Sequence, residues 1–154
     1  MTIPATFASA TPRFGLPLLF SGQAQKEFFV NEAHVLLDAL VHARVHGTAD
    51  IPPSDPVEGE AWLVQPSGQG DWSGNAQSIA VFTAGGWRFI PPQPGMRVFD
   101  SVSGRQLHFD DSWKFAADPG LPTGGTTVDL EARAAIGQLV AALRDLGLFA
   151  RTPG

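Results

Sequence analysis

The sequence predicts an α+β protein with an N-terminal arm and helix, a small antiparallel β barrel or sandwich of five to six strands, and a C-terminal helix. Two observations predict this order. Apolar residues recur at helical spacing near both ends of the chain, whereas the middle carries short alternating runs separated by turn residues. The corresponding domain boundaries are 1–49 for the arm and first helix, 50–117 for the β domain, and 118–154 for the linker and C-terminal helix.

The first element is an irregular arm that leads into a helix. Three prolines interrupt residues 1–20 and break any helix there. Residues 21–45 then carry an apolar stripe at helical spacing, with Ser21 as a plausible N-cap and Gly47 as a plausible stop. We expect this arm and helix to serve anchoring and assembly.

The middle of the chain reads as a series of short strands. Six strand-like runs lie between residues 61 and 116, and pairs of turn residues such as Gly85-Gly86, Pro94-Gly95 and Ser103-Gly104 separate them. Strands that are connected locally in this way favour a small antiparallel barrel or sandwich.

Residues 127–147 predict the second helix, with a capping-box-like start at Thr126 and a left-handed cap at Gly147. Its apolar residues step by four and three positions along a heptad seam about two heptads long. The seam residues are Ala132, Ile136, Leu139, Leu143 and Leu146. The seam fits either packing on the rest of the chain or a short bundle between copies. Because only 16% of residues are charged, we predict a stable homo-oligomer.

The composition excludes several classes of function. A net charge of −5 argues against a nucleic-acid partner, which requires a basic surface. The absence of cysteine excludes disulfides and thiolate chemistry. No segment is apolar enough to span a bilayer, and the first residues lack the pattern of a signal peptide, so we expect no membrane partner and a protein made and used without the secretion pathway.

Two groups of polar residues could carry chemistry, and neither matches a catalytic motif. His34, Asp38, His42 and His46 share a drifting helical face and could bind zinc, but no glutamate sits between them as in zinc proteases. The adjacent acids at 110–111 are more typical of a turn than of a glycosidase. We therefore predict no metal, no cofactor, no catalytic residue and no enzymatic activity.

All four tryptophans lie in the β segment, where they could form a core or a ligand surface. We expect Trp62 and Trp87 to fill the core. Trp72 stands in the glycine-rich loop SGQGDWSGN, where we expect its side chain to be exposed. Together with Asp71 and Asn75, it is the candidate contact for a glycan ring.

Long stretches of the chain resemble one family. The segment TPRFGLPLLFSGQAQKEFFVNEAHVLLDALV resembles the N-terminal signature of an uncharacterised-domain family from alphaproteobacterial prophages and gene transfer agents. The similarity continues through residue 99, and TTVDLEARAAIGQLVAALRDLGLF is similar to a helical segment of phage structural proteins. The resemblance implies an appendage component, in a head spike or a tail fibre, of a virion or gene transfer agent particle.

The resemblance leaves two functions open and supplies no catalytic residue. In the first, the chain is the base or adaptor of a head spike that attaches a host-binding fibre to the capsid. In the alternative, it is a carbohydrate-binding module that recognises host capsular polysaccharide directly. The implied partners are the capsid protein, the spike fibre protein and copies of the chain, with five copies favoured on a head vertex and three in a tail fibre. Under the alternative, host polysaccharide is a further partner.

Overall fold

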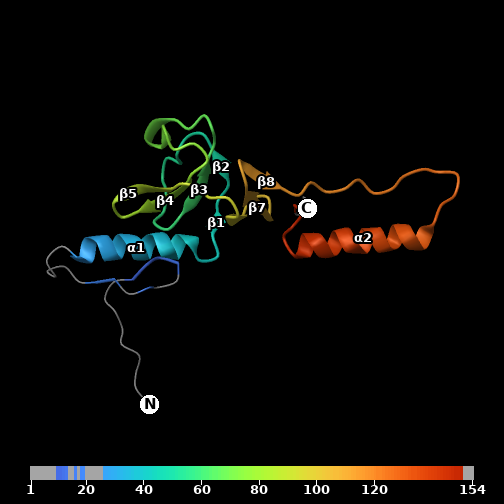
Figure 1. Ribbon diagram of the computed structural model, residues 1–154, viewed down its shortest axis with the longest axis horizontal. Helices are drawn as coiled ribbons and strands as arrows, with labels where there is room; N and C mark the ends of the chain where they lie inside the picture. Colours follow the sequence, from blue (N-terminus) through green and yellow to red (C-terminus); the bar gives the residue numbers. More distant parts are fainter. Residues whose placement is uncertain (1–9, 14–15, 17, 20–25, 151–154) are drawn as a thin grey trace, which may run out of the picture. The chain divides into compact units, whose positions relative to one another are not determined.

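The computed structural model describes residues 10–13, 16, 18–19 and 26–150 of the chain (Figure 1). The chain divides into two compact units, Met1–Pro92 and Gln93–Gly154. The predicted α+β class is confirmed, because helices and strands occupy separate parts of the sequence. No helix in the described ranges combines the length and the apolar character needed to cross a membrane.

The first unit begins with helix α1 (Lys26–Leu40). The predicted helix ran to residue 45, and its first five residues lie outside the described ones. The predicted end is wrong, because a turn follows Leu40 and the short strand β1 (Arg44–Val45) begins soon after it. His42 adopts a left-handed backbone with φ of 50°, which ends the helical path before Gly47 is reached.

A four-stranded mixed sheet forms the centre of this unit. Its strands, in spatial order, are β2 (Thr48–Ala49), β3 (Ala61–Val64), β4 (Ile79–Thr83) and β5 (Gly86–Ile90). Strand β2 runs parallel to β3, and the other pairs are antiparallel. The predicted Gly85-Gly86 hairpin is confirmed, and Gly86 has the positive φ of 90° that this turn requires.

Different elements pack against the two faces of this sheet. In the register of the strands, Trp62 lies opposite Ala80, and Ala80 lies opposite Phe89, so these side chains share one face. The 3-10 turn η1 (Gly70–Trp72) lies over this face and adds Trp72 to its core. Helix α1 packs against the other face of β4, so the sheet lies between α1 and η1, as Figure 1 shows.

The second unit contains an antiparallel sheet and a helix. The strands β6 (Arg97–Asp100), β7 (Arg105–Phe109) and β8 (Trp113–Phe115) pair in chain order. An exposed linker leads to helix α2 (Leu130–Asp145).

The ends of α2 have well-defined caps. The helix begins later than predicted, because the Asp129 side chain caps it by accepting a 2.8 Å hydrogen bond from the backbone N–H of Ala132, so the expected cap at Thr126 is wrong. The predicted C-terminal cap is confirmed. Gly147 has φ of 70°, and the N–H of Leu148 folds back to the carbonyl of Leu143 at 2.9 Å.

Candidate functional site

The arm is joined to the C-terminal end of α1 by a buried carboxylate. Asp38, whose side chain is only 1% exposed, accepts hydrogen bonds from the hydroxyl of Thr11 at 2.8 Å and from the backbone N–H of Arg13 at 2.9 Å. The guanidinium of Arg13 donates to the carbonyls of Asp38 and Ala39, both at 2.9 Å. A cation at the helix C-terminus satisfies carbonyls that have no partner within the helix.

A second connection holds the arm near the start of α1. The side-chain amide of Asn31 accepts from the N–H of Leu19 at 2.8 Å and donates to the carbonyl of the same residue at 3.0 Å. This two-bond arrangement satisfies the backbone of Leu19 without a neighbouring strand. These two bonds hold Leu19 against α1.

The β4–β5 hairpin provides the opposite side. The hydroxyl of Thr83 donates to the carbonyl of Gly86 at 2.7 Å and accepts from the N–H of Gly85 at 3.2 Å, which tightens the turn. Arg88 joins the hairpin to the helix, because its Nε lies 2.7 Å from a carboxylate oxygen of Glu32. Both of these side chains are about two-thirds buried, since 33% and 35% of their surfaces remain exposed.

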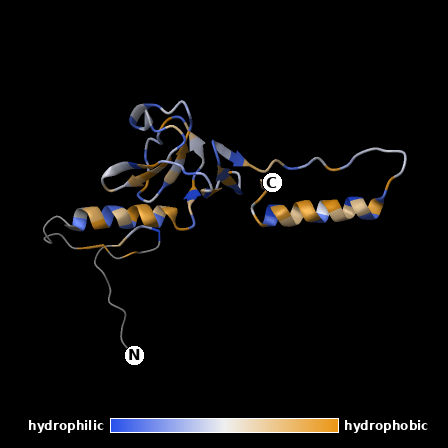
Figure 2. Ribbon diagram, viewed as in Figure 1, coloured by the Kyte–Doolittle hydropathy of each residue, from blue (hydrophilic) through white to orange (hydrophobic). Residues whose placement is uncertain are grey.

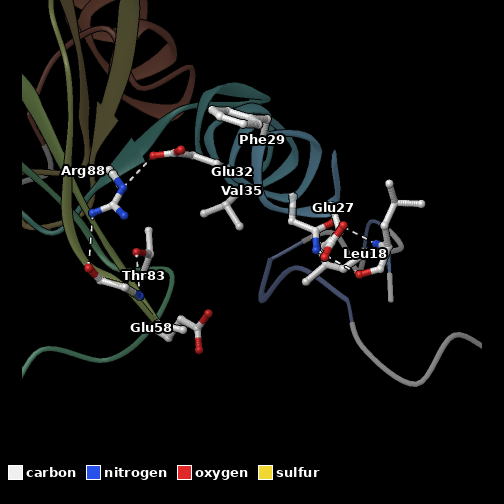
Figure 3. Close-up of a pocket in the computed structure, with 12 residues that line it drawn as sticks. Leu18, Glu27, Phe29, Glu32, Val35, Glu58, Thr83 and Arg88 are labelled. Atoms are coloured by element: carbon white, nitrogen blue, oxygen red, sulfur yellow. Dashed lines mark hydrogen bonds and ion pairs between the residues drawn. The ribbon is translucent and has the colours of Figure 1, made fainter. Parts of the chain in front are cut away.

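The arm, α1 and the hairpin together border a groove of about 740 Å³ (Figure 3). Its lining is mostly apolar, with carboxylates among the apolar groups. The lining residues are Leu18, Leu19, Glu27, Phe29, Asn31, Glu32, Val35, Glu58, Thr83, Ala84, Gly85 and Arg88. These residues offer no paired nucleophile and base. The size and the apolar lining of the groove suit it to binding. The sequence patterns did not predict this groove.

Trp72, the predicted glycan contact, has no exposed surface in the structure. The expectation of an exposed side chain is wrong. The N–H of Gln69 bonds to the carbonyl of Asp50 at 2.8 Å and folds the loop back over the sheet. Trp72 then meets the ring of Trp87 edge-on, with centroids 5.1 Å apart. A side chain without accessible surface cannot stack on a sugar ring.

The two residues named with Trp72 remain at the surface of the loop. Asp71 is exposed, whereas Asn75 is half-buried and donates from its side-chain amide to the carbonyl of Ser73 at 3.2 Å. Trp62 and Trp87, which we expected in the core, are half-buried and pack on the cluster around Trp72.

Two of the four residues considered as metal ligands make other contacts. Asp38 holds the arm, as described above, and His46 stacks on Trp62 with ring centroids 5.9 Å apart. Across the described ranges, no group of three or more histidine, aspartate or glutamate residues is arranged so that it could hold a metal ion. That His34, Asp38, His42 and His46 bind no metal stays a prediction.

The adjacent acids on the β7–β8 turn form ion pairs with one lysine. The ammonium of Lys114 lies 3.0 Å from Asp110 and 2.7 Å from Asp111. The hydrogen bond from Lys114 lowers the pKa of Asp111 below its ordinary value and raises the pKa of Lys114. These contacts agree with a structural role for the turn.

The predicted oligomer seam lies on an exposed face of α2. The exposed fractions are 42% for Ile136, 60% for Leu139 and 67% for Leu146, whereas Leu143 is half-buried. Figure 2 shows the apolar residues along this helix.

The linker before α2 is attached to a different face of the helix. Arg133 donates to the carbonyl of Gly124, and Arg144 pairs with Asp118. Val140 follows Arg133 by seven positions and precedes Arg144 by four, so the three residues share one face of the helix. Val140 is 4% exposed. The heptad seam is therefore not the face that the linker contacts.

Comparison with known proteins identifies a family for the larger part of the chain. A family model described as "Protein of unknown function (DUF2793)" matches residues 30–114. The matched range includes most of α1 and the whole β4–β5 hairpin, but neither the arm nor α2. No curated protein matches the chain. Since the family model spans more than half of the sequence, the chain belongs to the DUF2793 family.

Proposed function

We propose that this chain is a structural component of a phage-like particle, and that it is the base or adaptor of a head spike that attaches a host-binding fibre to the capsid. Two kinds of evidence support the proposal. The resemblance to prophage and gene transfer agent appendage proteins supports a place in a phage-like particle. The exposed apolar face of α2 supplies a surface suited to assembly.

The exposed seam of α2 is the observation that carries the proposal. Leu139 and Leu146 are 60% and 67% exposed, although both belong to a heptad pattern. A run of exposed apolar residues usually marks a contact with another protein. In knobs-into-holes packing, the side chains of one seam insert between those of a facing seam. An identical seam provides such a surface, so a second copy of the chain is the simplest partner. We propose a closed ring, with five copies on a head vertex and three as the alternative.

The alternative function is direct recognition of host polysaccharide. It depended on Trp72 as the stacking residue, and the burial of that side chain does not support this role. Asp71 and Asn75 would then have to bind a sugar by hydrogen bonds alone. We therefore propose the base, with adhesion supplied by a separate fibre protein.

Light scattering on the purified chain tests the assembly. We expect a mass five times, or alternatively three times, the 16.3 kDa of one chain. Leu139→Asp places a carboxylate in the seam and should yield monomers, because burying an unpaired charge is costly. Gln138→Asp adds the same charge to the same helix outside the seam, so that variant should keep the mass of the oligomer.

The same variants separate dissociation from unfolding. Because Leu139 is largely exposed within one chain, Leu139→Asp should leave the helical circular dichroism signal of the monomer intact. A wild-type chain that is monomeric at tens of micromolar would contradict the assembly. Mass spectrometry of purified particles tests separately whether the chain is a component of a phage-like particle. Absence of the chain from the particles would contradict the proposal.

A further inference from the structure

The groove beside α1 has the size of a ligand site and an exposed aromatic at its border. Its volume of about 740 Å³ lies within the range of about 300–1,000 Å³ that is usual for binding pockets. Phe29 is 73% exposed, while Leu18 and Val35 are half-buried in the lining. A groove of this kind can accept apolar side chains of a partner.

The charges of the groove select the kind of partner. Among the lining residues that the structure describes, the carboxylates are Glu27, Glu32 and Glu58, and the one guanidinium is that of Arg88, which is paired with Glu32. Within the described part of the chain, Glu58 has no recorded ion pair or hydrogen bond. Figure 3 shows Glu58 beside the hairpin, across the groove from α1. The lining therefore carries an excess of negative charge next to apolar surface.

The walls of the groove are held in place before any partner binds. Asn31 fixes Leu19 by two hydrogen bonds, and Arg88 connects the hairpin to Glu32 on α1 and to the carbonyl of Gly85 at 3.2 Å. A preformed site loses less conformational entropy on binding than a flexible one. The groove can therefore bind a short segment without rearrangement.

We infer that this groove binds a short peptide segment of a partner protein, in which apolar side chains alternate with lysine or arginine. The apolar side chains enter the groove beside Phe29 and Val35, and the flanking cations face Glu58 and the other carboxylates. An acidic segment would place like charges together, which opposes binding. This inference extends beyond the proposed assembly through α2 and does not depend on it.

Two labelled peptides test the inference by fluorescence anisotropy. One alternates leucine with lysine, and the other alternates leucine with glutamate, so that their apolar content is equal. We expect the leucine–lysine peptide to bind the wild-type chain, and to bind less tightly at 0.5 M salt than at 0.1 M salt, because salt screens exposed charges. The leucine–glutamate peptide should not bind.

Variants locate the binding site. Glu58→Gln removes one exposed carboxylate and should weaken binding up to about fivefold, the effect of one surface ion pair. Phe29→Ala should weaken it further by removing apolar contact surface. Glu131→Gln makes the same change of charge at a residue of α2 that is not part of the groove lining, and it should leave the affinity unchanged.

Three results would overturn the inference. The first is equal binding of both peptides, and the second is no binding of the leucine–lysine peptide. The third is an affinity that Glu58→Gln and Phe29→Ala leave unchanged. Both residues are exposed, so the variants should fold, and an unchanged melting curve verifies this. The mass of the wild-type assembly is read separately, so failure here leaves the proposal for α2 intact.

Discussion

The stability of the Trp72→Ala variant distinguishes two roles of Trp72, as a buried core residue or as a ligand contact at the surface. The side chain is 0% exposed and packs with Val64, Ala80 and Trp87 over one face of the first sheet. If Trp72 were a surface residue for glycan stacking, its removal would leave folding intact. Because it is buried, its removal should leave a cavity beneath the loop that carries it.

The size of the effect follows from the burial. Truncating a buried aromatic to alanine costs about 3–5 kcal/mol of unfolding free energy. A domain of about 60–100 residues loses about 4–8 °C of melting temperature per kcal/mol. The unit Met1–Pro92 falls in this size range. We therefore expect Trp72→Ala to lower the melting temperature by at least about 12 °C, or to prevent folding of this unit.

Differential scanning calorimetry of three variants provides the assay. Trp72→Phe keeps most of the apolar volume and removes an indole N–H that has no hydrogen-bond partner among the described residues, so it should cost less than Trp72→Ala. Asp71→Ala, at the exposed neighbour, should stay within about 0.5 kcal/mol of the wild type. A Trp72→Ala protein that melts with the wild type would refute the packing argument. If that variant also lost adhesion to capsulated cells, the glycan interpretation would be restored.

Three further changes test other contacts. Asp38→Ala removes a carboxylate that accepts two hydrogen bonds from the arm, and urea unfolding should show a loss of about 1.5–3 kcal/mol. Arg144→Ala releases one end of the linker, and limited proteolysis within residues 116–126 should become faster while the melting temperature stays unchanged. Lys114→Ala should raise the pKa of Asp111 back toward 3.8 in an NMR titration, because the hydrogen bond from Lys114 depresses it. Since the folded pKa is the lower one, this contact contributes stability above pH 3.8 and loses it as the pH falls below that value.

The longer strands could be predicted because their signals are local. All six predicted runs form strands, β3 to β8, since each alternates and is followed by turn residues. The two-residue strands β1 and β2 were missed, because their pairing partners are distant in sequence. Thr48 of β2, for example, lies parallel to Leu63 of β3. Parallel pairing leaves no turn signal between the strands.

The groove could not be predicted because distant residues form it. Leu19 of the arm bonds to Asn31 of α1, and Arg88 of β5 bonds to Glu32, which lies 56 positions earlier in the sequence. One signal was available. Alternation along β5 places Arg88 on the face opposite Trp87, so this charged residue needed an acidic partner from an element covering that face. The pattern of α1 alone does not show that Glu32 is this partner.

Trp72 and the α2 seam show why periodicity cannot assign burial. The loop around Trp72 has no apolar period, yet contacts such as the one between Gln69 and Asp50 fold it over the sheet and bury the ring completely. The seam around Leu139 has a regular period, yet Ile136, Leu139 and Leu146 are exposed. A period shows that a surface is apolar, not which chain covers it. On α2 the linker is bound on another face, through Arg133 and other contacts. We therefore propose that a second copy of the chain packs on the seam. The mass of the Leu139→Asp variant tests this contact directly.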